Sequence, residues 1–142
     1  MNPALRILFK TVTSTHIFLY RNSGGRIWRK MLGTPVLILT TTGRKSGKQR
    51  TTPVVYNRDG ENYLIAASLG GFDYHPGWYH NIKASGSAII EVRADKMHCV
   101  AEILEGEERD NAYQIFKDNA KNFIEYEKRT ERVIPVIRLI PQ

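Results

Sequence analysis

Three features are scarce in this sequence: cysteine, long apolar runs, and acidic residues in the first half of the chain. The single cysteine, Cys99, excludes an intramolecular disulfide, and nothing indicates an oxidising compartment. Cys99 and the four histidines show none of the spacings typical of zinc ligands, so we expect no metal site. No apolar run reaches the roughly 18 residues that span a bilayer, and the N-terminus lacks a signal-peptide pattern. We therefore expect a cytoplasmic protein.

The scarcity of acidic residues is confined to one part of the chain. Residues 1–58 contain eleven lysines and arginines and no aspartate or glutamate, whereas residues 59–142 carry a net charge of −4. So basic a segment predicts an anionic partner, which could be a phosphorylated cofactor, a nucleic acid or an anionic membrane. The alternative is that these cations pair with the carboxylates of the second half.

The N-terminal segment has the apolar spacing of a helix. Leu5, Leu8, Phe9 and Val12 form one apolar stripe of a helix expected over residues 3–20. This helix would either pack against its own domain or lie on a membrane surface as a basic amphipathic helix. Three glycines in the next thirteen positions favour irregular backbone up to residue 33.

Beyond residue 34 the pattern becomes that of short strands joined by hairpins. Asp59-Gly60 is a hairpin signal, and Pro53 predicts an edge strand or a bulge. Cys99 lies inside an expected strand and should belong to the core. About six antiparallel strands are expected, over residues 36–42, 49–57, 63–68, 88–93, 97–104 and 133–140.

Three further helices are expected among these strands, over residues 77–84, 107–121 and 123–132. In the second of them Ala112, Ile115 and Phe116 would face the core. The hairpins are too short for βαβ crossovers, so the pattern predicts a mainly β, α+β fold: a small antiparallel barrel with flanking helices. The length of 142 residues suits one domain over 1–142, with an N-terminal helix and loop in 1–33 and the barrel in 34–142.

Two segments have the composition of a binding site. The turn 43–48 is basic and flanked by glycines, and Arg44, Lys45, Lys48 and Arg50 can donate charge-assisted hydrogen bonds to phosphate or carboxylate. Ser46, Thr51 and Thr52 add hydroxyl donors, although the segment is not a P-loop. The second segment, 67–82, is rich in aromatic residues, and Trp78 and Tyr79 could flank a planar ring or simply belong to the core. No nucleophile with a matching base is evident, which is typical of an enzyme whose cofactor carries the chemistry.

These segments resemble the deazaflavin (coenzyme F420)-dependent nitroreductase family. The resemblance runs in order from about residue 16 to residue 140. It is carried by blocks that read YRNSGG at 20–25, PVLILTTTGRKSG at 35–47, RTTP at 50–53, ASLGG at 67–71, HPGWYHNI at 75–82 and RVIPV at 132–136. It implies a split β-barrel of the FMN-binding type, and it implies binding of coenzyme F420, whose tail carries a phosphate and a polyglutamate chain.

The resemblance also implies roles for particular residues. Those expected to grip the phosphate and tail are Arg44, Lys45, Lys48, Arg50 and Thr51. Those expected to line the deazaflavin ring are Pro53, Ala67, Ser68, Gly70 and Gly71, with Trp78, Tyr79 and Asn81 shaping the groove. Val55, Phe123 and Tyr126 would contact the substrate, and Ser68 or Tyr126 would stabilise negative charge that develops on it.

The implied activity is hydride transfer from reduced F420 to an electron-poor substrate such as a quinone, an enone or a nitro compound. Two alternatives stay open. The same barrel could hold FMN, heme or a lipid, because fold does not determine function. A nucleic-acid-binding barrel is disfavoured, because its aromatic residues would interleave with the basic ones instead of gathering in one loop. We expect a small-molecule substrate and no nucleic acid, with a homodimer and a peripheral membrane contact through residues 3–20 as further expectations.

Overall fold

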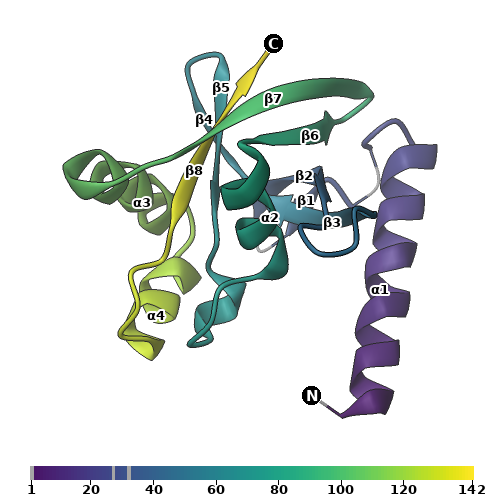
Figure 1. Cartoon of the computed structure of the whole chain (residues 1–142), viewed down its shortest axis with the longest axis horizontal. Helices are drawn as coiled ribbons and strands as arrows, with labels where there is room; N and C mark the ends of the chain where they lie inside the picture. The colour runs from purple at the N-terminus through teal and green to yellow at the C-terminus, as the bar shows by residue number, and fades with distance from the viewer. Residues whose placement is uncertain (1, 27, 32) are drawn as a thin grey trace.

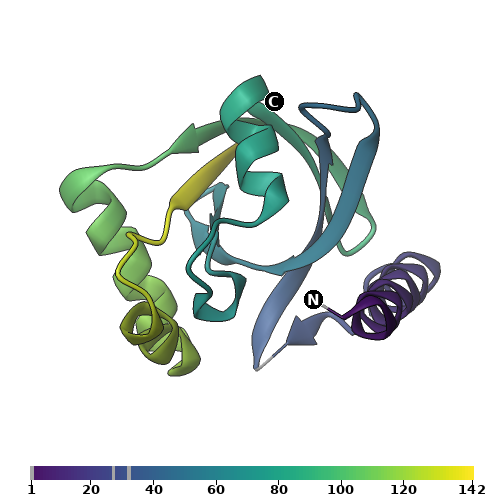
Figure 2. The same cartoon turned by 60° about the horizontal axis from the view of Figure 1, so that its bottom comes forward.

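The computed structural model, which describes residues 2–26, 28–31 and 33–142, is a curled antiparallel sheet with helices around it (Figures 1 and 2). The strands are β1 (Lys30–Met31), β2 (Thr34–Thr42), β3 (Gln49–Val55), β4 (Asn57–Asp59), β5 (Asn62–Ala66), β6 (Ser87–Val92), β7 (Asp95–Ile103) and β8 (Val136–Pro141). The helices are α1 (Pro3–Asn22), α2 (Gly77–Ser85), α3 (Gly106–Asn119) and α4 (Asn122–Arg129), with a short 3₁₀ helix at Leu69–Gly71.

The sheet order is β1-β2-β6-β7-β8-β5-β4, and β3 pairs with β2 outside this path. The predicted α+β class is therefore confirmed, and the described strands exceed the expected six because β1 and β4 are very short. The expected strand over 49–57 is interrupted at Tyr56, and the last strand begins at Val136 instead of residue 133. Pro53 lies on β3, whose partner among the described strands is β2 alone, as predicted for an edge strand.

Alternating side chains divide β5 between two hydrophobic cores. Tyr63 and Ile65 point into the curled sheet, where α2 adds Tyr79 and Ile82. Leu64 and Ala66 point outward, against α3 and α4. This period-2 alternation is what a strand covered on both faces requires. Because α2 contributes to the inner core, the segment just before it is held close to the rim of the sheet.

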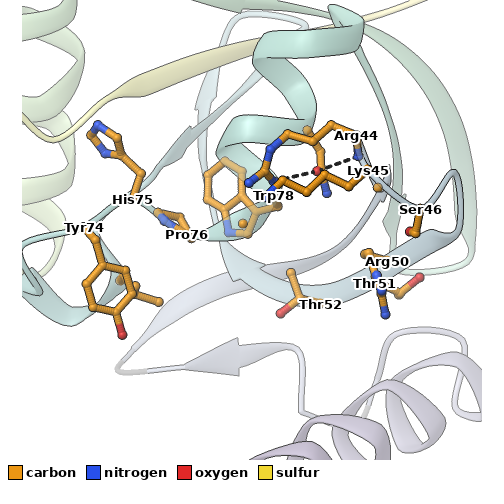
Figure 3. A pocket seen from close by; sticks show the side chains of 14 residues that line it. Arg44, Lys45, Ser46, Arg50, Thr51, Thr52, Tyr74, His75, Pro76 and Trp78 are labelled. Carbon is orange, nitrogen blue, oxygen red and sulfur yellow. Dashed lines mark hydrogen bonds between the residues drawn. The ribbon is translucent and has the colours of Figure 1, made fainter. Parts of the chain in front are cut away.

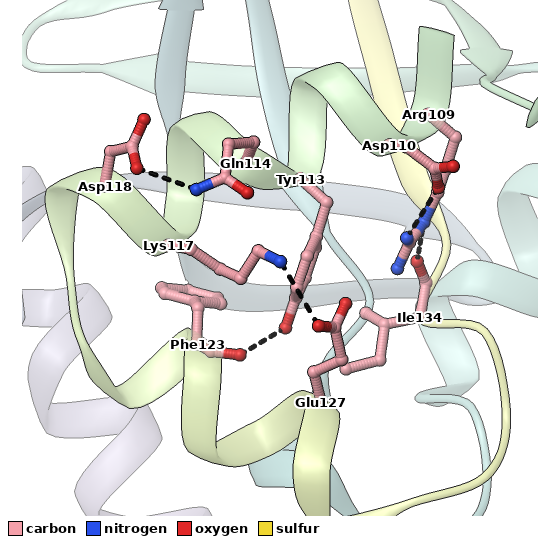
Figure 4. A network of polar contacts seen from close by, with 9 residues as sticks. All are labelled: Arg109, Asp110, Tyr113, Gln114, Lys117, Asp118, Phe123, Glu127 and Ile134. Carbon is pink, nitrogen blue, oxygen red and sulfur yellow. Dashed lines mark hydrogen bonds and ion pairs between the residues drawn. The ribbon is translucent and has the colours of Figure 1, made fainter. Parts of the chain in front are cut away.

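Helices α3 and α4 cover the outer face through aromatic packing and a few polar contacts (Figure 4). Tyr113 is fully buried and donates a hydrogen bond to the carbonyl of Phe123 at 2.6 Å. Lys117 pairs with Glu127 at 3.2 Å, which joins the two helices again. The expectation that Ile115 faces the core is wrong: its side chain is 37% exposed, because the helix turns Tyr113 inward instead.

Helix α1 is attached to the barrel by its C-terminal half. Tyr20 is buried, and its hydroxyl accepts a hydrogen bond from the backbone of Arg93 at 2.6 Å. Arg21 pairs with Glu91 at 2.6 Å. Gly25, with φ +79°, passes so close to Arg93 that a Cβ atom would lie 2.1 Å from its Cα. These contacts join the end of α1 to the β6–β7 hairpin.

The N-terminal half of α1 does not pack as the apolar stripe suggested. Leu5, Leu8, Phe9 and Val12 are all exposed, with Phe9 at 61%. The side chains that bury lie further along, at His16 and Tyr20. The stripe is present but nothing in the described chain covers it, so packing against its own domain is the wrong interpretation of these four residues. Within the described residues, no helix is long and apolar enough to cross a membrane.

Candidate functional site

The basic turn between β2 and β3 is closed by its own backbone. The amide of Gly43 donates to the carbonyl of Lys48 at 2.7 Å, and the amide of Gly47 donates to the carbonyl of Gly43 at 2.8 Å. Gly47 has φ +71°, a conformation that glycine adopts without strain. A Cβ atom on Gly43 would lie 2.6 Å from the hydroxyl of Ser46. The turn is therefore compact, and its cationic side chains project from a defined backbone.

A buried amide connects this turn to α2. Asn81 is buried on α2, and its Oδ1 accepts from the backbone amide of Arg44 at 3.1 Å and from the Arg44 guanidinium at 3.3 Å. Its Nδ2 donates to the hydroxyl of Thr41 at 3.1 Å. One side chain thus satisfies groups on β2, on the turn and on a long cation. Asn81 holds the basic turn against the start of α2.

A pocket of about 630 Å³ lies between the basic turn and the segment before α2, within the range typical of small-molecule sites. Figure 3 shows the side chains of the turn on one side of it, Tyr74 and His75 on the other, and Trp78 between them. The lining residues are Gly43, Arg44, Lys45, Ser46, Arg50, Thr51, Thr52, Leu69, Tyr74, His75, Pro76, Gly77, Trp78 and Asn81.

The pocket has a cationic end without a carboxylate to balance it. Arg44, Lys45 and Arg50 line it, and the lining set contains no acidic residue. Of the eleven cations that precede Asp59, Arg21 alone forms an ion pair within the described part of the chain. The alternative that the basic half pairs with the acidic half is therefore wrong. This end of the pocket suits an anion that brings its own negative charge.

The opposite wall is held in place by Arg132, which lies after α4. Its guanidinium donates to the carbonyls of Ser68 at 2.8 Å, Ala67 at 3.2 Å and Phe72 at 2.8 Å. Its Nη1 also lies 2.9 Å from Nδ1 of His75. Arginine can only donate, so Nδ1 is the acceptor and the ring proton is on Nε2. One side chain thus fixes the backbone from 67 to 75.

The surroundings of His75 disfavour its charged form. Burial lowers its pKa from the usual 6.5, and the neighbouring Arg132, His80 and Lys83 lower it further. Its ring packs against Tyr79 with the centroids 4.6 Å apart. A protonated His75 would lose the hydrogen bond from Arg132 and place a second cation beside it. The arrangement therefore favours the uncharged ring in the pocket wall.

The structure brings six of the expected cofactor residues to the pocket: Arg44, Lys45, Arg50, Thr51, Trp78 and Asn81. Seven others do not line it: Lys48, Pro53, Ala67, Ser68, Gly70, Gly71 and Tyr79. Several of these seven support its walls. Ala67 and Tyr79 belong to the inner core, and the carbonyl of Ser68 holds Arg132. A Cβ atom on Gly71 would lie 2.9 Å from the backbone of Tyr126, so glycine allows the 3₁₀ helix to approach α4.

The three expected substrate residues lie together against the outer core rather than in this pocket. Phe123 is 3% exposed, and its ring packs against Phe116 and Tyr126. Val55 and Tyr126 are partly buried beside the same cluster. Asn122 donates to the hydroxyl of Tyr126 at 3.3 Å, which leaves the Tyr126 proton available to a ligand.

Some lining residues were not among those expected. Leu69, Tyr74, His75, Pro76 and Gly77 line the pocket, and all of them lie in or beside the motif segments identified from the sequence. The hydroxyls of Ser46 and Thr52 were recognised as donors but not assigned to the site. Their position within the basic segment was the available signal. Arg132 begins one of the motif blocks, but its role could not be predicted, because its partners lie up to 65 residues away.

The curled antiparallel sheet with flanking helices matches the split-barrel fold of solved structures. A structure described as an F420-H2-dependent reductase (FDR-A) is 35% identical, with a TM-score of 0.68, over 74% of this chain and 93% of that one. A heme storage protein from Vibrio cholerae shares the fold at 14% identity, with a TM-score of 0.59 over 90% of this chain and 89% of that one. The predicted split-barrel fold is confirmed.

The chain belongs to the F420H2-dependent quinone reductase family, whose model matches residues 12–141. An F420H2-dependent quinone reductase of Mycobacterium tuberculosis is 41% identical over an alignment of 128 residues that covers 87% of this chain and 86% of the relative. A further solved structure, described as a domain-swapped dimer, is 30% identical, with a TM-score of 0.71 over 97% of this chain and 99% of that one. The chain is thus an oxidoreductase of the F420-dependent class, as the resemblance implied.

Proposed function

We propose that this chain reduces a quinone with electrons from reduced coenzyme F420, which binds in the pocket beside the basic turn. The observation that carries the proposal is the cationic end of the pocket, where Arg44, Lys45 and Arg50 lack carboxylate partners among the described residues. The printed names of the family and of its relatives supply the cofactor and the substrate class. Enones and nitro compounds share the electron-poor character of quinones and are further candidate substrates.

The lining residues fit the two parts of this cofactor. The guanidinium groups of Arg44 and Arg50 and the hydroxyl of Thr51 would hold the phosphate, with Lys45 near the tail. Lys48, which lies on the same turn outside the lining, would contact the tail where it leaves the pocket. The ring would lie toward Trp78, on the wall that Arg132 holds in place. Pro53 and the loop with Ala67, Ser68, Gly70 and Gly71 would border it, while Tyr79 and Asn81 support that wall from α2.

When bound, reduced F420 supplies a hydride to the acceptor. The protein positions the acceptor against the ring, which provides much of the acceleration through proximity. Tyr126, with Val55 and Phe123 beside it, would hold the acceptor. The hydroxyl of Tyr126 or Ser68 would donate a hydrogen bond to the acceptor oxygen as negative charge develops there. Asn122 keeps the Tyr126 hydroxyl oriented, because the amide already donates to it.

A binding titration tests the cofactor assignment. Fluorescence anisotropy should show F420 binding that weakens as salt increases, with FMN binding far more weakly. Arg50→Ala should weaken F420 binding about fivefold, since one exposed charge-assisted contact is worth about 1 kcal/mol. Lys96→Ala, an exposed cation of β7 outside the pocket, is the matched control and should leave the affinity unchanged. Binding of FMN alone would keep the fold and overturn the cofactor.

Steady-state kinetics with a soluble quinone test the proton donor. Tyr126→Phe should lower kcat by about 10² while the affinity for F420 stays the same. Ser68→Ala should have the smaller effect if Tyr126 is the donor, and the larger one if the roles are reversed. If both variants keep the wild-type kcat, solvent provides the proton and neither residue has a catalytic role.

We also propose that α1 makes a peripheral contact with an anionic membrane through residues 3–20. Leu5, Leu8 and Val12 are exposed beside Arg6 and Lys10, and the helix has no acidic residue. Co-sedimentation with phosphatidylglycerol vesicles should be lost in Leu5→Gln/Leu8→Gln and retained in Thr11→Gln/Thr15→Gln. A homodimer is the competing cover for this face. If the protein ignores vesicles and the leucine variant turns a dimer into a monomer in sedimentation velocity, a second copy covers α1.

A further inference from the structure

A second cavity, of about 690 Å³, lies between the N-terminal half of α1 and the start of β3. It is lined by Pro3, Arg6, Ile7, Phe9, Lys10, Thr13 and Arg50. Arg50 also lines the pocket beside the basic turn, so the two cavities meet at this side chain. Figure 3 shows α1 passing beneath the strand that carries Arg50, Thr51 and Thr52. The two cavities thus form neighbouring parts of one surface.

The charges around the second cavity are all of one sign. Arg6 and Lys10 are four residues apart on α1 and therefore share a face of the helix. Arg50 approaches the same space from β3. None of the three forms an ion pair with the described residues, and no carboxylate lines the cavity. Like charges at this spacing repel one another, so the cavity is built for an anion that reaches it from outside.

The cavity also has apolar walls, from Pro3, Ile7 and Phe9. Cations set among apolar side chains suit a flexible chain in which carboxylates alternate with short aliphatic linkers. A compact inorganic anion would leave these apolar walls unused. Because Arg50 is shared, such a chain could start at the first pocket and continue along α1.

We infer that this second cavity binds the polycarboxylate tail of the cofactor, with Arg6 and Lys10 pairing with its distal carboxylates. The inference rests on the proposed function for the identity of the ligand, but it assigns a role to a part of the chain outside the pocket beside the basic turn. It gives the barrel-facing side of α1 a binding role, while the outward apolar side remains available for the membrane. Arg50 then connects the phosphate end of the ligand to its tail.

The test compares F420 that lacks glutamates with F420 that carries a long glutamate tail, in buffer without lipid or detergent. The wild-type protein should bind the long-tailed form about tenfold more tightly, as two exposed ion pairs allow. Arg6→Gln/Lys10→Gln should remove this difference and leave the affinity for the glutamate-free form unchanged. Arg26→Gln/Lys30→Gln removes the same charge from exposed positions that line neither cavity and should keep the difference. Equal thermal midpoints would exclude misfolding.

Each outcome separates this inference from the proposed function. If the wild type binds both forms equally, or if both double variants lose the same affinity, the tail does not use α1 and the inference is wrong, whereas the cofactor assignment stands. A second readout does not need the cofactor: a short γ-glutamate peptide should shift the backbone amide resonances of residues 4–13, and Arg6→Gln/Lys10→Gln should abolish these shifts. If the peptide shifts these resonances but F420 does not bind, the proposed function fails and the polycarboxylate site remains. If neither ligand binds, both are overturned.

Discussion

Asn81 is the residue at which stability and ligand binding should depend on the same hydrogen bonds. Its amide accepts from the backbone and side chain of Arg44 and donates to Thr41, and both Asn81 and Thr41 are buried. In Asn81→Ala the Thr41 hydroxyl loses its partner at a buried position, and the Arg44 backbone amide loses its partner at a partly buried one beside the pocket. The contact to the Arg44 guanidinium counts for less, because that group is exposed and water replaces the amide.

Two such hydrogen bonds, each with a net value of about 1 ± 0.5 kcal/mol, lead us to expect a loss of about 1–3 kcal/mol. The basic turn also loses its attachment to α2, so Arg44 and Lys45 are no longer held ready for an anion. We expect the Kd for F420 to rise about tenfold, equivalent to about 1.4 kcal/mol of lost preorganisation. Urea denaturation and a fluorescence titration measure the two quantities on the same preparation.

Asn81→Asp separates the two effects. The carboxylate still accepts both hydrogen bonds from Arg44, so the loss of stability should be limited to the hydrogen bond that Nδ2 of Asn81 donates to the Thr41 hydroxyl, about 1 kcal/mol. The new negative charge pairs with Arg44 and opposes an anion in the pocket, so affinity should fall more than it does in Asn81→Ala. Gln114→Ala, which truncates an exposed amide on α3, is the control. If Asn81→Ala matches this control in both measurements, the amide does not hold the turn.

Three other predictions concern backbone, pH and thiol chemistry. Gly25→Ala should lower the free energy of unfolding by at least about 3 kcal/mol, because a Cβ would collide with Arg93. Gly24→Ala, also at positive φ, should lower it by only about 1–2 kcal/mol; urea titrations measure both. Stability should fall as pH drops below about 6.5, because the pKa of His75 is lowered on folding; His75→Gln should flatten this slope. Burial raises the pKa of Cys99 to about 11, so native protein should resist iodoacetamide at pH 8 and react once unfolded.

The sequence predicted most of the sheet because strand alternation is a local signal. β5 and β8 each supply side chains to the inner and outer cores in alternation, and both lie close to the expected ranges. The burial of Cys99 was confirmed for the same reason. Tyr113 was missed in favour of Ile115, because hydrophobicity alone favours isoleucine; the two positions lie about 200° apart around the helix, and the face with Tyr113 and Phe116 is the one that packs inward.

The candidate site was predicted only in part, because a pocket depends on contacts between distant segments. The cations of the basic turn were evident from charge alone. The opposite wall depends on Arg132, which reaches back to Ser68 and His75 across about sixty residues of sequence. The exposed half of α1 is a second case in which the sequence pattern does not show what a segment contacts. Periodicity identifies an apolar face, but it does not indicate whether the domain, a membrane or a second copy covers that face.

Asn81 and Arg50 together show how this chain divides folding from binding. Arg50 is exposed and lines both cavities, so its loss should weaken ligand binding and leave the unfolding free energy nearly unchanged. Asn81 is buried on α2, where the inner core fixes its position, so its loss should lower both quantities. In a plot of binding free energy against unfolding free energy, substitutions at Asn81 and its partner Thr41 should therefore fall on one line. Substitutions at Arg50 should lie off that line. If the Arg50 variants fall on the same line, the basic turn is part of the folding core and its cations are not free for a ligand.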